Sequence, residues 1–220
     1  MGFPRDLKII QPVESSLFNP VQFQTRSLLS STMSAMWSWF NQRLKVSFPM
    51  MISEFNQSLV IVACEVEYAK DYGFFEGSEF EHGVDSVQIR QKDMLCDIHY
   101  SFKAHGQIFA RVRIVYRFLV LNGDDSLSAS PGKINPAILN RFLPNEIDPA
   151  PVSRLLPMRL KNIEEHATPK AKGRYEFVLY RHLCEVADQW SFIEVPAFAS
   201  QGRELMVRNN RDEFLNLSPA

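Results

Sequence analysis

Hydrophobic and polar residues alternate most regularly in the middle of the chain. Every second residue from 94 to 102 is apolar, and after a break at 103–107 a second alternating run extends from 108 to 121. A period of two is typical of β-strands, and two such runs joined by a short turn predict an antiparallel hairpin. We expect one face of the second strand to be wholly apolar, with Ile114 and Tyr116, and the other to mix Phe109 with arginines. Such a sheet packs its apolar face on another layer.

Two further strands are predicted before this hairpin. Leu59–Tyr68 is apolar at its start and then alternates, with Glu65 and Glu67 on one face and Cys64 on the other. Which of these faces is inside stays open, because a shift of one residue exchanges Glu65 for Cys64. Between residues 80 and 89 the alternation changes phase, which predicts a strand with a β-bulge near Asp85.

One long helix is predicted ahead of the strands. Apolar side chains recur at helical spacing over Met33–Leu44, with polar ones on the other side. Ser30–Thr32 consists of residues that favour N-caps, so we expect the helix to begin there and to end before Pro49. Its wide apolar face is typical of a helix that a sheet wraps.

The two ends of the chain are less regular. We expect residues 1–20, which contain three prolines, to form an irregular arm and Val21–Thr25 to form a short strand. Asn135 followed by Pro136 predicts the N-cap and first turn of a short helix that ends near Phe142.

Beyond residue 142 the pattern changes again. Four prolines between 144 and 157 predict an extended connection. After it we expect strands at Tyr175–Leu183 and Glu204–Arg208, with helical turns at Glu185–Ile193. We therefore predict a domain over residues 1–142, followed by a Pro-rich connection and C-terminal extension over 143–220. The aromatic spacing in this extension could mark a degenerate half-repeat.

Composition excludes several classes of protein. The 220 residues are 45% hydrophobic and 12% aromatic, which suffices for a substantial core. The net charge of −1 comes without a basic stripe, so we expect no nucleic-acid partner. No run approaches the roughly 18 apolar residues of a membrane span, and the first 12 residues lack the apolar segment of a secretory signal, so we expect a cytoplasmic protein. Three widely spaced cysteines without zinc-ligand spacing predict reduced core thiols, with no metal or other cofactor.

The order of a short strand, one long helix and three or four long antiparallel strands resembles the hotdog fold of acyl-thioester enzymes. The resemblance covers about residues 20–142 and rests on the helix with Trp39 and Arg43, the strand that ends at Tyr68, and the hairpin 93–121. It implies an α+β fold, a curved antiparallel sheet around one central helix, and pairing into a homodimer. A cone-shaped, cyclase-like fold is the alternative, but it requires several N-terminal helices.

The resemblance also implies that the chain hydrolyses or binds an acyl thioester of coenzyme A or an acyl carrier protein. In thioesterases of this fold, helix-start amides polarise the carbonyl while a carboxylate at or near the central helix activates water. Residues 27–34 contain neither a carboxylate nor a histidine. Either the base lies elsewhere, or the protein is a non-catalytic acyl- or polyketide-binding partner in a biosynthetic pathway.

The candidates for a displaced catalytic group are Glu54, Glu65 and Asn41. Each also has a non-catalytic alternative. Glu54 could lie in a solvated loop, Glu65 could face solvent from its strand, and Asn41 could lie on the polar side of the helix. His82 and His99 are further acid–base candidates, with a structural role in a strand as the alternative.

We expect the acyl chain to lie between the helix and the sheet. Arg111, Arg113 and Arg117 share a strand face and could bind the phosphates of coenzyme A or of a phosphopantetheine arm. A solvated face with cross-strand partners such as Asp97 is the alternative. The residues expected to contact the substrate are Ser31, Thr32, Met36, Trp37, Phe40, Tyr68, Arg111 and Arg113.

Overall fold

The structure is a computed structural model that describes residues 7–20, 22–123, 128–150, 176 and 192–209. The chain divides into two compact units, Met1–Leu156 and Pro157–Ala220. In the second unit the described residues form a short 3-10 helix, Phe192–Glu194, and α5, Val195–Asn209. The prediction of a strand at 204–208 is therefore wrong, while the elements predicted at 175–183 and 185–193 lie almost entirely outside the described residues.

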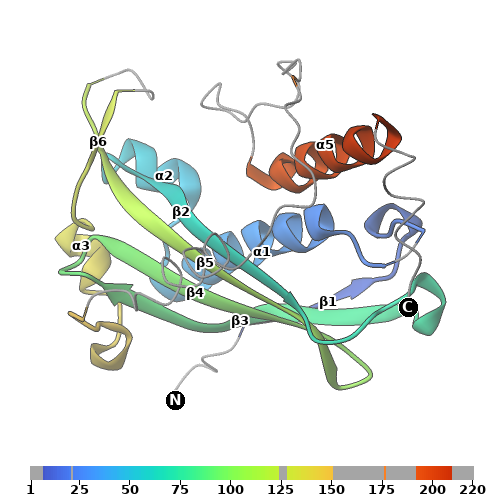
Figure 1. The fold of residues 1–220 in the computed structure, drawn as a ribbon. Helices are drawn as coiled ribbons and strands as arrows, with labels where there is room; N and C mark the ends of the chain where they lie inside the picture. The colour runs from blue at the N-terminus through green and yellow to red at the C-terminus, as the bar shows by residue number, and fades with distance from the viewer. Residues whose placement is uncertain (1–6, 21, 124–127, 151–175, 177–191, 210–220) are drawn as a thin grey trace. The chain divides into compact units, whose positions relative to one another are not determined.

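Six antiparallel strands form the sheet of the first unit, in the order β1-β3-β4-β5-β2, with β6 paired to β5. Figure 1 shows this sheet curving around helix α1, which confirms the predicted architecture. The strands are β1 (Leu7–Pro12), β2 (Gln57–Tyr68), β3 (Glu79–Arg90), β4 (Leu95–Ala104), β5 (Gln107–Leu121) and β6 (Ala129–Pro131).

The predictions of the four long strands, β2 to β5, are confirmed. The hairpin of β4 and β5 turns at His105 and Gly106, both with positive φ, and β3 carries a register shift between Val84 and Ser86. The prediction of an irregular arm is wrong for Leu7–Pro12, which pairs with β3 as an edge strand. A proline at the end of an edge strand removes no bond of the sheet interior.

Helix α1 begins two turns earlier than predicted. It spans Thr25–Trp39 and continues as a π-helical turn, Phe40–Leu44. Ser30–Thr32 is therefore internal to the helix, and the hydroxyl of Thr32 donates to the carbonyl of Leu29 at 2.7 Å. The strand predicted at residues 21–25 is also wrong, because Phe23 makes one isolated bridge with Phe18 before the helix starts.

Shorter helices follow α1 and β6. α2 (Phe48–Ser53) has Pro49 in its first turn, so the proline marks a new helix as well as the end of α1. α3 (Pro136–Leu139) has the predicted cap, since the side chain of Asn135 accepts from the amide of Ala137 at 2.8 Å. No helix among the described residues is long and apolar enough to span a membrane.

An aromatic cluster joins α1 to the sheet. The ring of Phe23 lies 5.0 Å from Phe18, 5.1 Å from Phe80 and 5.5 Å from Phe109. The alternation predicts Phe109 on the mixed face with the arginines, but the β4–β5 register shifts beside it and the residue is fully buried in this cluster. Burying each ring contributes roughly 1.5–3 kcal/mol, so the cluster firmly positions the start of α1.

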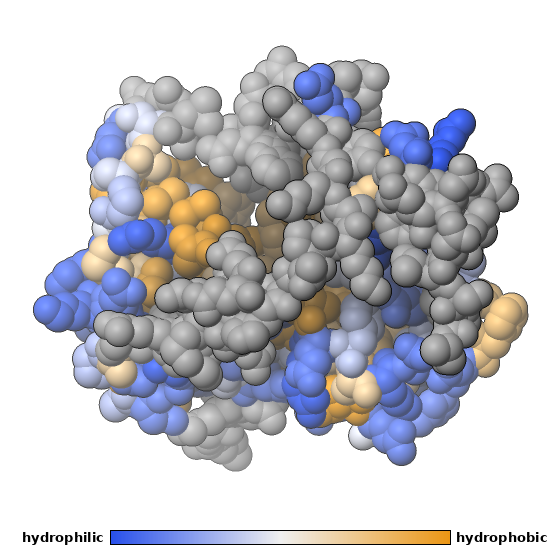
Figure 2. Space-filling view, in the orientation of Figure 1, coloured by the Kyte–Doolittle hydropathy of each residue, from blue (hydrophilic) through white to orange (hydrophobic). Residues whose placement is uncertain are grey.

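One edge of the sheet keeps apolar side chains exposed. β2 is the last strand on its side in the described sheet, and Val60 and Val62 are 38% and 50% exposed. Figure 2 shows hydrophobic surface in the region where Figure 1 draws α2 and β2.

Candidate active site

The start of α1 lies beside two hydroxyl groups. Tyr68, the last residue of β2, donates to the carbonyl of Phe23 at 2.9 Å, and its oxygen is 3.0 Å from Oγ1 of Thr25. The side chain of Gln24 does not cap the helix, because it donates to the carbonyl of Phe18 at 2.6 Å. The amides of the first turn, which carry partial positive charge, therefore point out of the helix next to these hydroxyls.

The electrostatics of this helix start favour an electron-rich ligand atom. Burial raises the pKa of Tyr68 above its ordinary value, so the hydroxyl remains a donor at neutral pH. The first turn of α1 lies wholly within the described residues and contains no acidic residue. Amides and hydroxyls in this arrangement can polarise a carbonyl oxygen.

The register of the sheet puts His82 at the same level as Tyr68. His82 lies opposite Phe102. Phe102 lies in turn opposite Ala110, and Ala110 lies opposite Tyr68. Opposite residues of neighbouring strands point to the same face. His82 therefore faces α1 at the level of its first turn, where Tyr68 contacts Thr25.

His82 is buried among aromatic rings and is 3% exposed. Its ring stacks on Phe102 at 5.6 Å and lies 5.7 Å from Phe80. Burial lowers the pKa of His82 to about 4, so the imidazole is neutral at pH 7. Its Nδ1 atom has no hydrogen-bond partner within the part of the chain that the structure describes.

Farther along α1 the concave face is apolar, with a buried pair of tyrosines. The hydroxyls of Tyr100 and Tyr116 are 3.2 Å apart, and Tyr116 donates to Sδ of Met33 at 3.7 Å. Burial raises the pKa of both tyrosines. Met36 and Phe40, both predicted to contact an acyl chain, are buried in the same core.

The remaining predicted residues of α1 occupy different environments. Ser31 and Thr32 lie in the middle of α1, and both are buried. Trp37 is half-buried and packs on Phe48 with ring centroids 4.7 Å apart. Asn41 is exposed in the π-helical turn, about 24 Å along the helix from Thr25 at the usual rise per residue.

Neither candidate glutamate lies at the start of α1. Glu54 is exposed at the C-terminal end of α2, beyond the far end of α1. Glu65 pairs with Arg113 across the sheet, on the convex face, with 3.8 Å between Oε2 and Nη1. The structure thus brings Tyr68 to the start of α1 on the concave face. It brings Glu65 to Arg113 on the convex face, which is the other side of the sheet.

A buried carboxylate organises the convex face. Asp97 is 1% exposed and accepts two hydrogen bonds from Arg113, Nε to Oδ1 at 2.9 Å and Nη2 to Oδ2 at 2.8 Å. These bonds raise the pKa of Arg113. Nε of Arg90 is 3.3 Å from Asp97, and Nη1 of Arg90 donates to Asp148 at 2.6 Å. Arg111, by contrast, is exposed.

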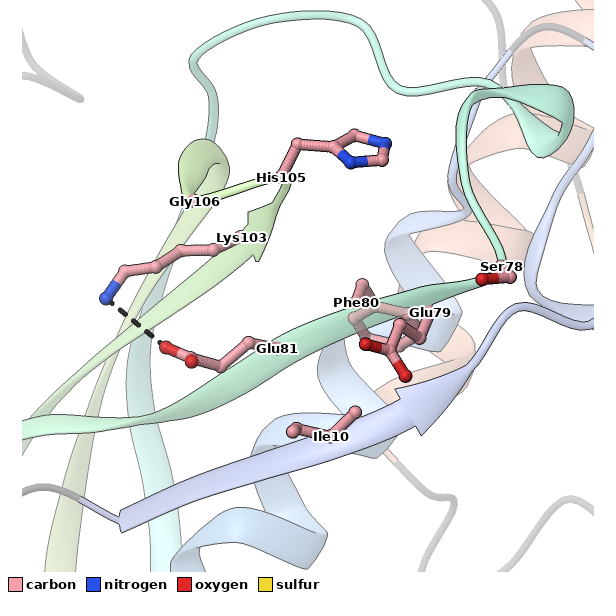
Figure 3. A pocket seen from close by; sticks show the side chains of 8 residues that line it. All are labelled: Ile10, Ser78, Glu79, Phe80, Glu81, Lys103, His105 and Gly106. Carbon is pink, nitrogen blue, oxygen red and sulfur yellow. Dashed lines mark ion pairs between the residues drawn. The ribbon is translucent and has the colours of Figure 1, made fainter.

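A separate surface pocket of about 440 Å³ lies at the ends of β1, β3 and β4. Figure 3 shows Lys103 pointing toward Glu81, with 3.5 Å between Nζ and Oε1. Ile10 lies opposite Glu81 on the neighbouring strand β1. Nε2 of His105 is hydrogen-bonded to the carbonyl oxygen of Glu76 at 2.6 Å. No residue predicted from the sequence as part of the site lines this pocket. Its lining carries two glutamates, Glu79 and Glu81, and one lysine, Lys103.

The described cysteines are free thiols, but only one is in the core. Cys96 is buried and Cys64 is exposed at the sheet edge, so the prediction of core thiols is wrong for Cys64. Cys184 lies outside the described residues. Within the described ranges no group of three or more histidine, cysteine, aspartate or glutamate side chains could hold a metal ion.

Thr25 is a site residue that the sequence pattern does not reveal. It is expected in a strand, because the polar triplet Ser30–Thr32 offers a second helix start next to the apolar stripe. The signal that could have identified it is Thr25-Arg26-Ser27 ahead of Leu28-Leu29, a polar run before an apolar pair.

The fold is that of known thioesterases. The chain aligns with an oleoyl thioesterase (putative) from Lactobacillus plantarum at a TM-score of 0.64 and 8% identity, over 90% of this chain and 71% of that one. It aligns with the 12:0-ACP thioesterase from Umbellularia californica at 0.65 and 9%, over 92% and 76%. The dynemicin thioesterase aligns at 0.50 and 15%, over 66% and 99%. The predicted hotdog fold is confirmed.

No protein-family model matches the chain, and no curated protein matches it in sequence. The likeness is therefore one of fold.

We predict that Arg113→Met lowers the free energy of unfolding by about 3–5 kcal/mol, because it leaves the buried carboxylate of Asp97 without its two closest donors. Urea denaturation checks this. Arg111→Met, at an exposed position on the same strand face, is the matched control and should change the value by less than about 0.5 kcal/mol. Equal effects of the two variants would contradict the assignment.

The buried neutral imidazole of His82 predicts a pH dependence of stability. Its folded-state pKa of about 4 is below the unfolded value of about 6.5, so only the unfolded chain binds a proton between these values. Stability should be complete above pH 6.5 and fall by up to about 3 kcal/mol as the pH drops to 4. Urea titrations of wild type and His82→Phe check this. A pH slope that the variant leaves unchanged would contradict it.

Proposed function

We propose that this protein hydrolyses acyl thioesters carried by coenzyme A or by an acyl carrier protein. The observation that carries the proposal is the uncapped start of α1 beside the hydroxyls of Tyr68 and Thr25, against a concave sheet face. The three structural neighbours described above are named as thioesterases, which supports this class of reaction.

In this proposal the thioester carbonyl oxygen lies at the start of α1. The first-turn amides stabilise the negative charge that develops on that oxygen when water attacks the carbonyl carbon. The hydroxyl of Tyr68 joins them when its one proton turns from the carbonyl of Phe23 to the oxyanion. The carbon–sulfur bond then breaks, and the products are a carboxylic acid and a thiol. The apolar concave face along α1, with Met36 and Phe40, is where the acyl chain would lie after side chains part.

The sequence-based candidates for catalysis stay in this proposal as variants to be assayed. Glu54, Glu65 and Asn41 each retain a predicted role, as do Arg111 and Arg113 for the phosphates of the carrier. Glu54 and Asn41 lie at or beyond the far end of α1. Glu65 lies on the convex face. These positions favour another residue as the base.

The assay is release of free thiol from a panel of acyl-coenzyme A and acyl-carrier-protein substrates. We expect wild type to turn over at least one of them and Tyr68→Phe to lower kcat by roughly 10²-fold, because one donor to the oxyanion is lost. Tyr72→Phe is the matched control, since the buried hydroxyl of Tyr72 has no partner among the described residues, and its kcat should match wild type.

Two results would contradict the proposal. Absence of turnover on every substrate would overturn hydrolysis, and saturable binding of a thioester in that case would favour the non-catalytic acyl-binding partner. Turnover with wild-type kcat in Tyr68→Phe would leave a thioesterase whose oxyanion site is elsewhere.

We further infer that two copies pair through β2 into a homodimer. β2 is a twelve-residue edge strand of the described sheet, and an edge of this length offers backbone donors and acceptors to a second strand. Val60 and Val62 add exposed apolar area there.

Light scattering tests this pairing. We expect wild type at about twice the chain mass of 25.4 kDa, and Val62→Lys shifted towards the monomer because charge on an edge strand disfavours pairing. Asp71→Lys, a charge change outside the strands, is the control. A monomeric wild type at micromolar concentration would overturn the inference.

A further inference from the structure

His82 lies where the proposed reaction requires a proton acceptor. It shares a row across the concave face with Tyr68, and Tyr68 contacts the first turn of α1. Three strand spacings separate β3 from β2, which amounts to about 14 Å. Phe102 and Ala110 lie between the two side chains in this row, so a thioester group and a water molecule enter this width once the aromatic side chains around Phe23 part. The other described candidates lie on the convex face or near the far end of α1.

The environment of His82 is unusual for a residue that only packs. The residue is 97% buried, yet Nδ1 has no partner among the described groups, and buried polar atoms are normally hydrogen-bonded. The stack on Phe102 holds the ring plane at 12° to its neighbour. A phenylalanine would satisfy such a stack without leaving a polar atom unpaired. An unpaired nitrogen on the sheet face that packs against α1 points to a bound molecule.

We propose that His82 is the general base of the thioester hydrolysis, an inference that rests on the proposed function. The imidazole takes a proton from water as the water oxygen bonds to the carbonyl carbon, and the carbonyl oxygen becomes an oxyanion at the start of α1. The carbon–sulfur bond then breaks as the oxyanion re-forms the carbonyl, and the imidazolium returns its proton to the departing sulfur. The products are a carboxylic acid and a thiol, and no oxidant or cofactor is consumed.

The other strand histidine that the sequence suggested provides the comparison. His99 lies on the convex face, its side chain is 47% exposed, and its Nε2 is 3.6 Å from the carboxylate of Asp97. It is a histidine in a neighbouring strand of the same sheet, but it faces away from α1. His99→Phe therefore controls for the loss of an imidazole without the loss of the proposed base.

The experiment compares His82→Phe, His82→Ala and His99→Phe in the thiol-release assay, with folding checked by circular dichroism and thermal unfolding. We expect His82→Phe to fold and to lose kcat by roughly 10²- to 10⁴-fold, while His99→Phe keeps wild-type kcat. Added imidazole should restore part of the activity of His82→Ala, where there is space for it, and none of that of His82→Phe. If His82→Ala does not fold, His82→Gly with imidazole present during refolding replaces it.

The outcomes separate this inference from the proposed function. An active wild type with full activity in His82→Phe, or with a folded His82→Ala that imidazole does not restore, would overturn the role of His82 and leave the thioesterase intact. A wild type without turnover on any substrate would overturn both.

Discussion

The burial of α1 against one concave sheet face is the constraint on which the rest of this structure depends. The helix carries polar residues such as Ser27 and Thr32 among its buried positions, so it is held by the aromatic cluster around Phe23 as much as by its own apolar stripe. Shifts in register in β3 and between β4 and β5 let the sheet curve around it. That packing fixes where the helix starts, and so where its amides point.

The two faces of the sheet consequently differ in polarity and in role. The concave face is mostly apolar, and His82, Tyr68 and the tyrosine pair are among the polar side chains that it carries. The convex face gathers its charges around Asp97, whose two hydrogen bonds from Arg113 tie β4 to β5 and whose contact with Arg90 adds β3. An acyl thioester, with a polar head and a long apolar chain, suits the concave face, while the convex network gives Asp97, Arg113 and Arg90 a structural role.

Much of this fold could be predicted because period-two alternation in the long strands reports directly which residues share a face. The start of α1 could not, since buried serines and threonines interrupt the hydrophobic pattern over its first two turns. Nor could the face of Glu65 be chosen, because only the pairing with Arg113 decides which side of β2 is inside. Phe109 shows the same limit, for one bulge residue reverses its side. His82 is a candidate in the sequence, but its neutrality and its unpaired nitrogen depend on its burial among neighbours such as Phe80 and Phe102, which the sequence does not reveal.

The central claim is that a thioester carbonyl binds at the start of α1. A crystal structure with an acyl-coenzyme A analogue in which a methylene group replaces the thioester sulfur tests this most directly, because the ketone cannot be hydrolysed. We predict the ketone oxygen within about 3 Å of a first-turn amide of α1 or of the Tyr68 hydroxyl, with the acyl chain along the concave face. A ketone bound on the convex face, or in the pocket at the ends of β1, β3 and β4, would contradict the account.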